Sequence, residues 1–240
     1  MRMLQDAYLS VMEAQTSDQF QRQVVRFARR LEFDTVSATT FIDHSSTHTE
    51  FHCVDNTPAA FKGDFRDPEL GRIDPVMQHC KHKSVPVIWN QATYVSQNRG
   101  PLWERQAQFG LKTGLALALH LPEGRHFFIG VDRDQSLTFS PKALSRSVAE
   151  LQLFAVHAQV AAQRIFAPET PLEREQLSLT PRELEALRWT MDGKLAWEVA
   201  GVLNISERTA VFHLQNATRK LGCKSKFQAV LKAIRLGLVA

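Results

Sequence analysis

The chain has 240 residues, of which 44% are hydrophobic and 22% charged, enough for one large domain or two ordinary ones with real cores. It contains no apolar run of about 18 residues, and its N-terminus lacks the charged, apolar and small-residue order of a secretory signal. We therefore expect a soluble, cytoplasmic protein with no membrane partner. Cys53, Cys80 and Cys223 lie far apart without a CxxC pair, so the sequence predicts neither a disulfide framework nor a metal site.

The net charge of +4 is unevenly distributed along the chain. From Ser178 to the end there are ten Lys or Arg and five Asp or Glu, a net charge of +5, whereas the rest of the chain carries 19 against 20. This asymmetry favours a polyanionic partner for the last quarter of the chain.

Alternating and helical patterns fill the first three quarters. Residues 18–31 place Phe20, Val24, Phe27 and Ala28 at helical spacing after a Ser/Asp cap. The stretches DTVSATTFID, THTEFHCVD, TGLALALHLP and HFFIGVDRD alternate like paired strands, the last two being separated by the turn residues Glu123 and Gly124. The pattern predicts an antiparallel sheet of about five strands with helices on both faces, an α-β-α sandwich that often encloses a ligand.

A domain boundary is expected after the helical pattern that begins near Ser140. Pro168 and Pro171 interrupt this pattern within a Glu/Arg cluster that has no apolar period. We predict a first domain at residues 1–166, a linker at 167–177 and a second domain at 178–240, giving an α+β chain with an all-α C-terminal part.

Four helices are predicted after the linker. The first begins at a Thr180 cap with Pro181 and Glu183 and runs to about Met191, and Gly193 ends it. The second helix is expected to turn Leu195, Val199 and Val202 or Leu203 inward. Ser206 caps the third, whose apolar stripe is Ala210, Leu214, Ala217 and Leu221, and the fourth is expected to bury Phe227, Val230, Leu231 and Ile234.

The third helix presents a polar face suited to DNA. A helix, a short turn and a second helix place the latter in the major groove, and amide side chains bond adenine edges while basic ones hold phosphates. The residues off the apolar stripe are Arg208, Thr209, Val211, Gln215, Asn216, Arg219 and Lys220. The alternative is the solvated face of a small interaction bundle, but the charge excess and the helix-turn-helix pattern together favour double-stranded DNA.

The residues of this segment also carry a resemblance. LTPRELEALRWTMDGKLAWEVAGVLNISERTAVFHLQNATRKLGCKSKFQAVLKAIRLGL resembles the C-terminal DNA-binding domain of LuxR-type transcription regulators, including their Leu-Thr-x-Arg-Glu start and Ile-Ser-Glu-Arg-Thr before the recognition helix. Ala210 stands where the family usually has Val. The resemblance implies that Val211 and Gln215 read bases, and that Arg208, Thr209, Arg219 and Lys220 chiefly hold phosphates.

The first domain resembles, more loosely, the autoinducer-binding domain of quorum-sensing members of the same family. Asp74-Pro75 is followed by Trp89 at the family spacing, and FGLKTG places Gly114 at its usual position. The resemblance implies a pocket for an acyl-homoserine lactone, in which Asp74 accepts the ligand amide N–H and Trp89 packs on the lactone end. Val76 and Leu102 are included among the expected pocket residues. Taken singly, Asp74 reads as a turn residue and Trp89 as core.

Four positions depart from the family pattern. The Trp that bonds the lactone carbonyl falls on Phe61, and the Tyr four residues later falls on Phe65, neither of which donates a hydrogen bond. A Tyr of some members becomes Thr57, and a frequent Ser or Thr becomes Gly130. Each lost neutral hydrogen bond is worth about 0.5–1.5 kcal/mol, so the pattern favours an atypical or less polar signal, or no obligatory one.

The leading hypothesis is a transcription regulator that senses a small molecule, uses no cofactor and binds promoter DNA as a homodimer. The alternative is a ligand-independent or partner-controlled regulator whose first domain is a dimerisation or interaction module. An enzyme is disfavoured, because no HExxH, GxSxG, P-loop or GxGxxG pattern occurs and His79-Cys80 has no orienting partner.

Overall fold

The computed structural model describes residues 2–43, 48–58, 68–137, 140–167 and 179–239. The chain forms two compact units, one built mainly from residues 1–168 and the other mainly from residues 169–240. Of the expected linker at 167–177, all but Ala167 lies outside the described residues. Among the described helices, none is both long and apolar enough to cross a membrane.

The first unit is organised around a five-stranded sheet in the order β2-β1-β5-β4-β3, in which all neighbours are antiparallel. The four strands expected from alternation are present. The fifth is a three-residue strand that is too short to show a period of two. The bounds are β1 (Thr35–Asp43), β2 (Thr49–Asp55), β3 (Val87–Trp89), β4 (Thr113–Leu121) and β5 (Arg125–Arg133), with a 3-10 turn at Pro122–Gly124.

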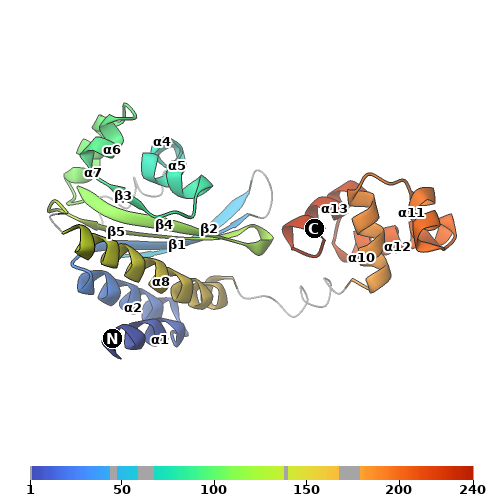
Figure 1. Ribbon diagram of the computed structural model, residues 1–240, viewed down its shortest axis with the longest axis horizontal. Coiled ribbons are helices and arrows are strands. Elements are labelled where there is room, and N and C mark those ends of the chain that lie inside the picture. Colours follow the sequence, from blue (N-terminus) through green and yellow to red (C-terminus); the bar gives the residue numbers. More distant parts are fainter. Residues whose placement is uncertain (1, 44–47, 59–67, 138–139, 168–178, 240) are drawn as a thin grey trace. The chain divides into compact units, whose positions relative to one another are not determined.

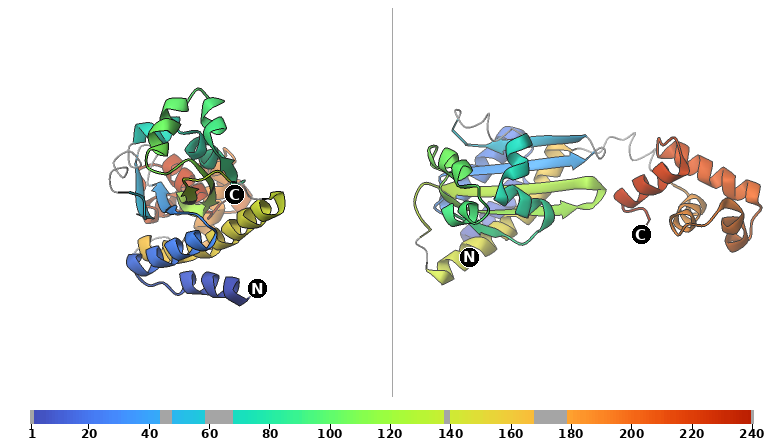
Figure 2. Two further views of the ribbon diagram at one scale, coloured as in Figure 1. Left: turned by 90° about the vertical axis from the view of Figure 1, so that its left-hand side faces the viewer. Right: turned by 90° about the horizontal axis from the view of Figure 1, so that it is seen from above.

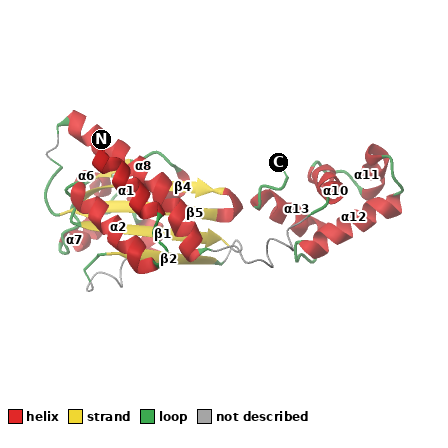
Figure 3. Cartoon of the chain, turned by 90° about the horizontal axis from the view of Figure 1, so that it is seen from below, coloured by secondary structure: helices red, strands yellow, loops and turns green. Residues whose placement is uncertain are grey.

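Helices α2 (Ser17–Arg30) and α8 (Pro141–Phe166) cover one face of this sheet, and α1 (Arg2–Met12) packs against these two helices on the side away from the sheet (Figures 1 and 3). Phe27 of α2 stacks on Phe154 of α8 with 3.8 Å between ring centroids, over strand residues such as Leu115 and Ile129 that are completely buried. The expected inward face of α2 is confirmed, but its N-cap is Thr16, one residue before the predicted Ser/Asp cap.

Four short helices lie over the opposite face (Figures 1 and 2): α4 (Pro68–Ile73), α5 (Pro75–His82), α6 (Gln91–Val95) and α7 (Gly100–Ala107). The expected α-β-α sandwich is therefore confirmed. Asp74 is the N-cap of α5 and Pro75 its first residue, a combination that suits a helix start because proline's missing N–H is not needed there.

The second unit is the expected four-helix domain: α10 (Pro181–Met191), α11 (Ala196–Leu203), α12 (Glu207–Lys220) and α13 (Lys226–Arg235). Thr180 and Glu183 form a reciprocal capping box, and Ser206 caps α12. The four stripe residues of α12 are all buried, as predicted.

The inward faces of α11 and α13 differ from the prediction. Leu195 is the exposed N-cap of α11 and Val202 is also exposed, whereas Val199 is buried and Leu203, the alternative to Val202, is partly buried against the core. In α13 only Val230 of the expected set is buried, and Phe227, Leu231 and Ile234 are 68%, 61% and 45% exposed. The inward face of α13 instead carries Ala229 and Ala233, whose small side chains allow close approach to α10 and α12.

Candidate ligand pocket and DNA-binding surface

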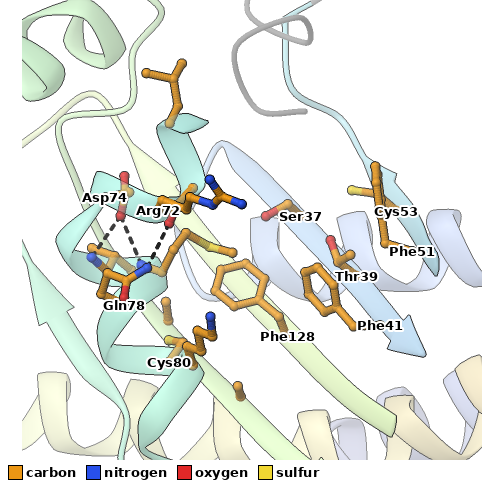
Figure 4. A pocket seen from close by; sticks show the side chains of 18 of the residues that line it. Ser37, Thr39, Phe41, Phe51, Cys53, Arg72, Asp74, Gln78, Cys80 and Phe128 are labelled. Atoms are coloured by element: carbon orange, nitrogen blue, oxygen red, sulfur yellow. Dashed lines mark hydrogen bonds between the residues drawn. The ribbon is translucent and has the colours of Figure 1, made fainter. Parts of the chain in front are cut away.

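A cavity of about 580 Å³ lies between the sheet and helices α4 to α7. This volume is within the range of small-molecule sites. Figure 4 shows Asp74 and Cys80 on the helical wall, with Ser37, Thr39 and Phe128 on the strands. The lining is largely apolar, so the few polar groups that reach it determine which ligand head groups it can accept.

The carboxyl group of Asp74 accepts hydrogen bonds from several groups around the cavity. Its Oδ1 accepts from the backbone N–H groups of Val76 (2.8 Å) and Met77 (3.0 Å), which caps α5 (Figure 4). Its Oδ2 accepts from the Tyr94 hydroxyl (3.0 Å) and from Gln106 Nε2 (3.0 Å). Four donors from three helices therefore stabilise a carboxyl group that is only 8% exposed.

Two neighbours of Asp74, Cys80 and Tyr94, titrate far above neutral pH. Burial, and then the charge of Asp74, raise the pKa of the Cys80 thiol to about 12 and also raise the pKa of Tyr94. Cys80 thus stays a thiol, which removes the nucleophile that a reading of His79-Cys80 as an enzyme site would require. Within the described part of the chain, no group of three or more His, Cys, Asp or Glu side chains is arranged to hold a metal ion.

The structure brings most of the expected pocket residues together. The cavity is lined by Asp74, Trp89, Val76, Leu102 and Gly130. Thr57 is buried but is not part of this lining, and its backbone N–H donates to Asp55 Oδ1 at 2.9 Å. Phe61 and Phe65 lie outside the described residues.

Sequence reasoning missed several polar residues on the pocket face of the sheet. Ser37 and Thr39 on β1 and Asp132 on β5 all line the cavity. Their signal was available, since every second residue of a strand faces the same side, so Gly130 implies Asp132 on the same face. Tyr94 and Gln106 carried no such signal, because they reach Asp74 only through the placement of α6 and α7.

Gly114 fixes how closely Trp89 can approach the sheet. Gly114 pairs with Trp89 on one side and with Asp132 on the other. A Cβ atom at residue 114 would lie 2.4 Å from the Val131 carbonyl oxygen and 2.7 Å from Trp89 Nε1, so no side chain fits. Trp89 packs edge-on against Tyr94 at 5.8 Å between centroids and is 3% exposed.

In the second unit, α12 turns the expected polar residues outward. Arg208, Gln215 and Arg219 are exposed, and Val211 and Asn216 are half-buried beside the buried stripe. The Thr209 hydroxyl hydrogen-bonds to Ser206 Oγ at 2.7 Å and so takes part in the helix start. A turn with Asn204 in the left-handed region (φ 54°) joins α11 to α12, which gives the helix-turn-helix arrangement.

Lys220 has a structural role that the sequence did not reveal. Its Nζ lies 2.8 Å from Glu183 Oε2, and the Glu183 side chain is 4% exposed. Burial alone would raise the pKa of Glu183, but hydrogen bonds from Lys220 and Thr180 outweigh it and the pKa is lowered. Among the seven expected DNA contacts, Lys220 is the one whose charge is paired with a carboxylate in an ion pair within the domain.

Comparisons with known proteins agree with this division of the chain. Residues 16–162 match the autoinducer-binding domain family, and residues 177–233 match the family described as bacterial regulatory proteins, luxR family. The quorum sensing-dependent transcriptional regulator RpaR of Rhodopseudomonas palustris is 36% identical over 171 residues, which cover 70% of this chain and 66% of RpaR. The transcriptional activator SolR of Ralstonia nicotianae is 30% identical, with 98% of each chain covered.

A solved structure of similar fold is that of SdiA from Escherichia coli. It is 26% identical, with a TM-score of 0.78 over 99% of this chain and 98% of SdiA. Another structure holds SdiA in complex with octanoyl-rac-glycerol, with a TM-score of 0.77, 25% identity, and 99% of this chain and 95% of that chain covered.

The fold, the site and these matches define a transcription regulator rather than an enzyme. The chain belongs to the LuxR family of quorum-sensing regulators, with an autoinducer-binding domain followed by a LuxR-type helix-turn-helix domain.

Proposed function

We propose that this regulator binds an acyl-homoserine lactone, or a related acyl signal, in the cavity beside Asp74 and controls promoter DNA binding in the cytoplasm. The supporting observation is the cavity itself, which has room for an acyl chain along a largely apolar lining and a buried carboxylate among its polar groups. RpaR is named as quorum sensing-dependent, and SdiA has been solved with an octanoyl ester. We assign residues 1–166 to signal binding, 167–177 to a linker and 178–240 to DNA binding.

The amide of such a signal must compete for Asp74. A carboxylate offers about four lone-pair sites, and the four donors around Asp74 match that number. Gln106 is the donor easiest to displace, because it is half-buried at the end of a long side chain on α7, whereas the backbone N–H groups of α5 are fixed. We therefore infer that the ligand N–H takes the place of the Gln106 amide on Oδ2.

Thermal unfolding tests the proposal. The unfolding midpoint of the full chain is measured alone and with acyl-homoserine lactones from hexanoyl to dodecanoyl, with and without a 3-substituent. A lactone that binds the folded state raises the midpoint as its concentration exceeds its Kd. If no lactone of the panel shifts the midpoint of a folded protein, this signal class is excluded.

Asp74→Ser is the variant that tests the role of the carboxylate. Serine caps helices about as well as aspartate, so α5 keeps its N-cap while the ligand loses its acceptor. We expect a lower midpoint without ligand, because the Tyr94 hydroxyl and Gln106 lose their acceptor, and a loss of most of the lactone-induced shift. Ser140, the N-cap of α8, provides the matched control as Ser140→Asp, which should leave the lactone response intact.

We also propose that the regulator binds DNA as a homodimer with α12 in the major groove. One helix offers few base contacts, so two copies on a two-fold symmetric site supply the affinity. The exposed apolar stripe of α13, formed by Phe227, Leu231 and Ile234, supports this, since such a stripe on a small domain is typical of an interface. On α12, Val211 and Gln215 are assigned to bases, and Arg208, Thr209, Asn216 and Arg219 to supporting contacts.

A second candidate function is a ligand-independent or partner-controlled regulator. The observation in its favour is that Asp74 is already hydrogen-bonded by four protein donors, so the pocket leaves its carboxylate satisfied without a signal. Purified protein that is folded, dimeric and bound to a selected DNA site without any additive supports this candidate. Dependence of DNA binding on an added lactone excludes it.

A further inference from the structure

Asp132 is a buried carboxyl group in the pocket that neither the family's polar positions nor the hydrogen-bond network of Asp74 uses. It lies on β5 between Thr35 of β1 and Gly114 of β4 and is 8% exposed. Its side chain lines the cavity, yet no group among the described residues forms a hydrogen bond with the carboxyl. Asp74, which is equally buried, has four such bonds. A carboxyl that lines the cavity without a hydrogen bond from the protein is available to a ligand.

Trp89 offers a second polar group at the same place. A Cβ atom at residue 114 would lie 2.7 Å from Asp132 Oδ1 and 2.7 Å from Trp89 Nε1, so the two atoms approach the same side of Gly114. Trp89 itself lines the cavity, with its ring edge-on to that of Tyr94. The carboxyl and the indole Nε1 thus lie close together beside Gly114, and Trp89 and Asp132 both line the cavity; we call the part of the pocket wall formed by these two residues the niche.

The protonation state of Asp132 determines what this niche recognises. Burial, and then the charge of Asp74, raise the pKa of Asp132 to about 8, so at neutral pH its carboxyl is mostly protonated and donates an O–H. The other titratable or charged groups that line the cavity are Asp43, Cys53, Arg72, Asp74, Cys80, Lys81, Tyr94, Arg105, His120 and His126. With two donors, from Asp132 and Trp89, the niche suits an oxygen acceptor.

We propose that Asp132 is a ligand contact that, together with Trp89, selects a signal whose head group presents a carbonyl oxygen. The proposal rests on the proposed function of the same pocket. It adds a contact to the ring carbonyl of the signal to the contact between Asp74 and the amide of the signal. It also accounts for recognition in a chain where the family's carbonyl donor is replaced by Phe61: the donor is moved from that segment to the sheet.

Paired probes that differ only in this carbonyl test the assignment. The lactone of the panel that binds best is compared with the N-acyl-3-aminotetrahydrofuran of the same acyl chain, which keeps the ring and the amide but lacks the carbonyl. Kd values are measured by calorimetry on the full chain. We expect removal of the carbonyl to weaken binding to the wild type about tenfold and to have a clearly smaller effect on Asp132→Ala, in which Trp89 remains as the other donor. Asp132→Asn keeps an N–H donor and should retain most of the difference.

Asp134→Asn is the matched control, because Asp134 is two residues away and pairs with Lys112 Nζ at 2.7 Å rather than lining the pocket. The pH profile gives an independent readout. Wild-type affinity for the lactone should fall as the pH rises through about 8, and Asp132→Asn should lack this decrease. The variant also distinguishes a pH dependence caused by Asp132 from one caused by His120 or His126. These two histidines line the cavity near the other end of the β4–β5 hairpin, about 20 Å away along β5.

Three results would overturn the assignment. Equal penalties for carbonyl removal in the wild type and in both Asp132 variants would show that the residue does not contact this group. An affinity that rises with pH in an Asp132-dependent way would mean that an ionised carboxylate accepts from an N–H or cationic head group instead. A wild type that binds neither probe would overturn the proposed function itself and this assignment with it, whereas tight binding with no coupling to Asp132 overturns this assignment alone.

Discussion

At the scale of single residues, the protonation of Asp132 has a consequence for the unliganded protein. The carboxyl has an ordinary pKa of 3.8 when exposed and about 8 in the fold, so between these values the folded state binds more protons than the unfolded state. Stability therefore falls as the pH rises from about 4 to about 8. We expect the unfolding midpoint of the wild type to decrease relative to that of Asp132→Asn between pH 5.5 and 8.5, and parallel curves would contradict this.

Gly114 is the residue whose replacement should disturb the pocket most directly. In Gly114→Ala the new methyl group meets the Val131 carbonyl oxygen at 2.4 Å, and this carbonyl is held in the sheet and cannot move aside. Overpacking of this kind costs about 1–3 kcal/mol of unfolding free energy. Chemical denaturation measures the loss. Gly71→Ala is the control, because a Cβ at that helical position has no neighbour within 4 Å and should be neutral or slightly stabilising.

At the scale of elements, the sequence predicts helices and strands whose hydrophobic pattern repeats over many residues. It does not predict which face of a helix is buried when two faces compete. Helices α2, α8 and α10 to α13 and the four long strands follow from their patterns, and the stripe of α12 is buried as its spacing requires. The prediction failed for α13, where large apolar residues on one side compete with Ala229 and Ala233 on another. The periodicity of a sequence records only where its hydrophobic residues lie. In the folded domain the alanine face of α13 packs against its neighbours because small side chains allow closer approach, and the larger apolar side chains remain exposed.

The same limit applies to the site. Asp74, Trp89 and Gly114 are recognisable because they lie in short motifs with fixed spacing. Tyr94 and Gln106 are 20 and 32 residues from Asp74, and they meet it only because three separate helices converge there. Asp132 was within reach of the strand alternation, but its importance depends on burial and on the absence of a partner, which no sequence pattern records.

The contact between α10 and α12 depends on the pair formed by Lys220 and Glu183. In Lys220→Met the Glu183 carboxylate stays buried without its charged partner, and we expect a loss of about 3 kcal/mol because breaking one side of a buried pair is costly. The lowered pKa of Glu183 implies a contribution that is present above its unfolded pKa and is lost as the pH falls through the lower folded value. Urea denaturation at pH 7 measures the loss. The double variant Glu183→Gln with Lys220→Met should recover part of it, and additive effects would show that the two residues are not coupled.

At the scale of the whole molecule, the salt dependence of DNA affinity should distinguish residues that bind phosphates from residues that read bases. A substitution that removes one phosphate-binding side chain reduces the slope of log affinity against log salt by about 0.9. We expect Arg208→Ala or Arg219→Ala to flatten this slope on every DNA, and Gln215→Ala to leave the slope unchanged while relaxing base preference at one position. Fluorescence anisotropy across a salt series, on a site obtained by selection, distinguishes them. Equal slopes for all three variants would remove the two arginines from the set of phosphate-binding residues.

The proposed dimer requires an apolar surface on at least one domain, and each of the two units presents an exposed apolar stripe. On α13 the stripe is Phe227, Leu231 and Ile234, and on α8 it is Leu153, Val156 and Val160, each of which is more than 40% exposed. A charge within a two-fold interface meets its own copy, so one substitution places two like charges in apolar surroundings. We expect Leu231→Glu to weaken binding to a two-fold DNA site by about a hundredfold or more while leaving the thermal shift by the lactone unchanged. Val156→Glu tests the other stripe in the same way, and sedimentation velocity reports the oligomeric state of both variants. If Leu231→Glu binds the full site normally and Val156→Glu is monomeric, the first domain holds the dimer together and the α13 stripe has another role.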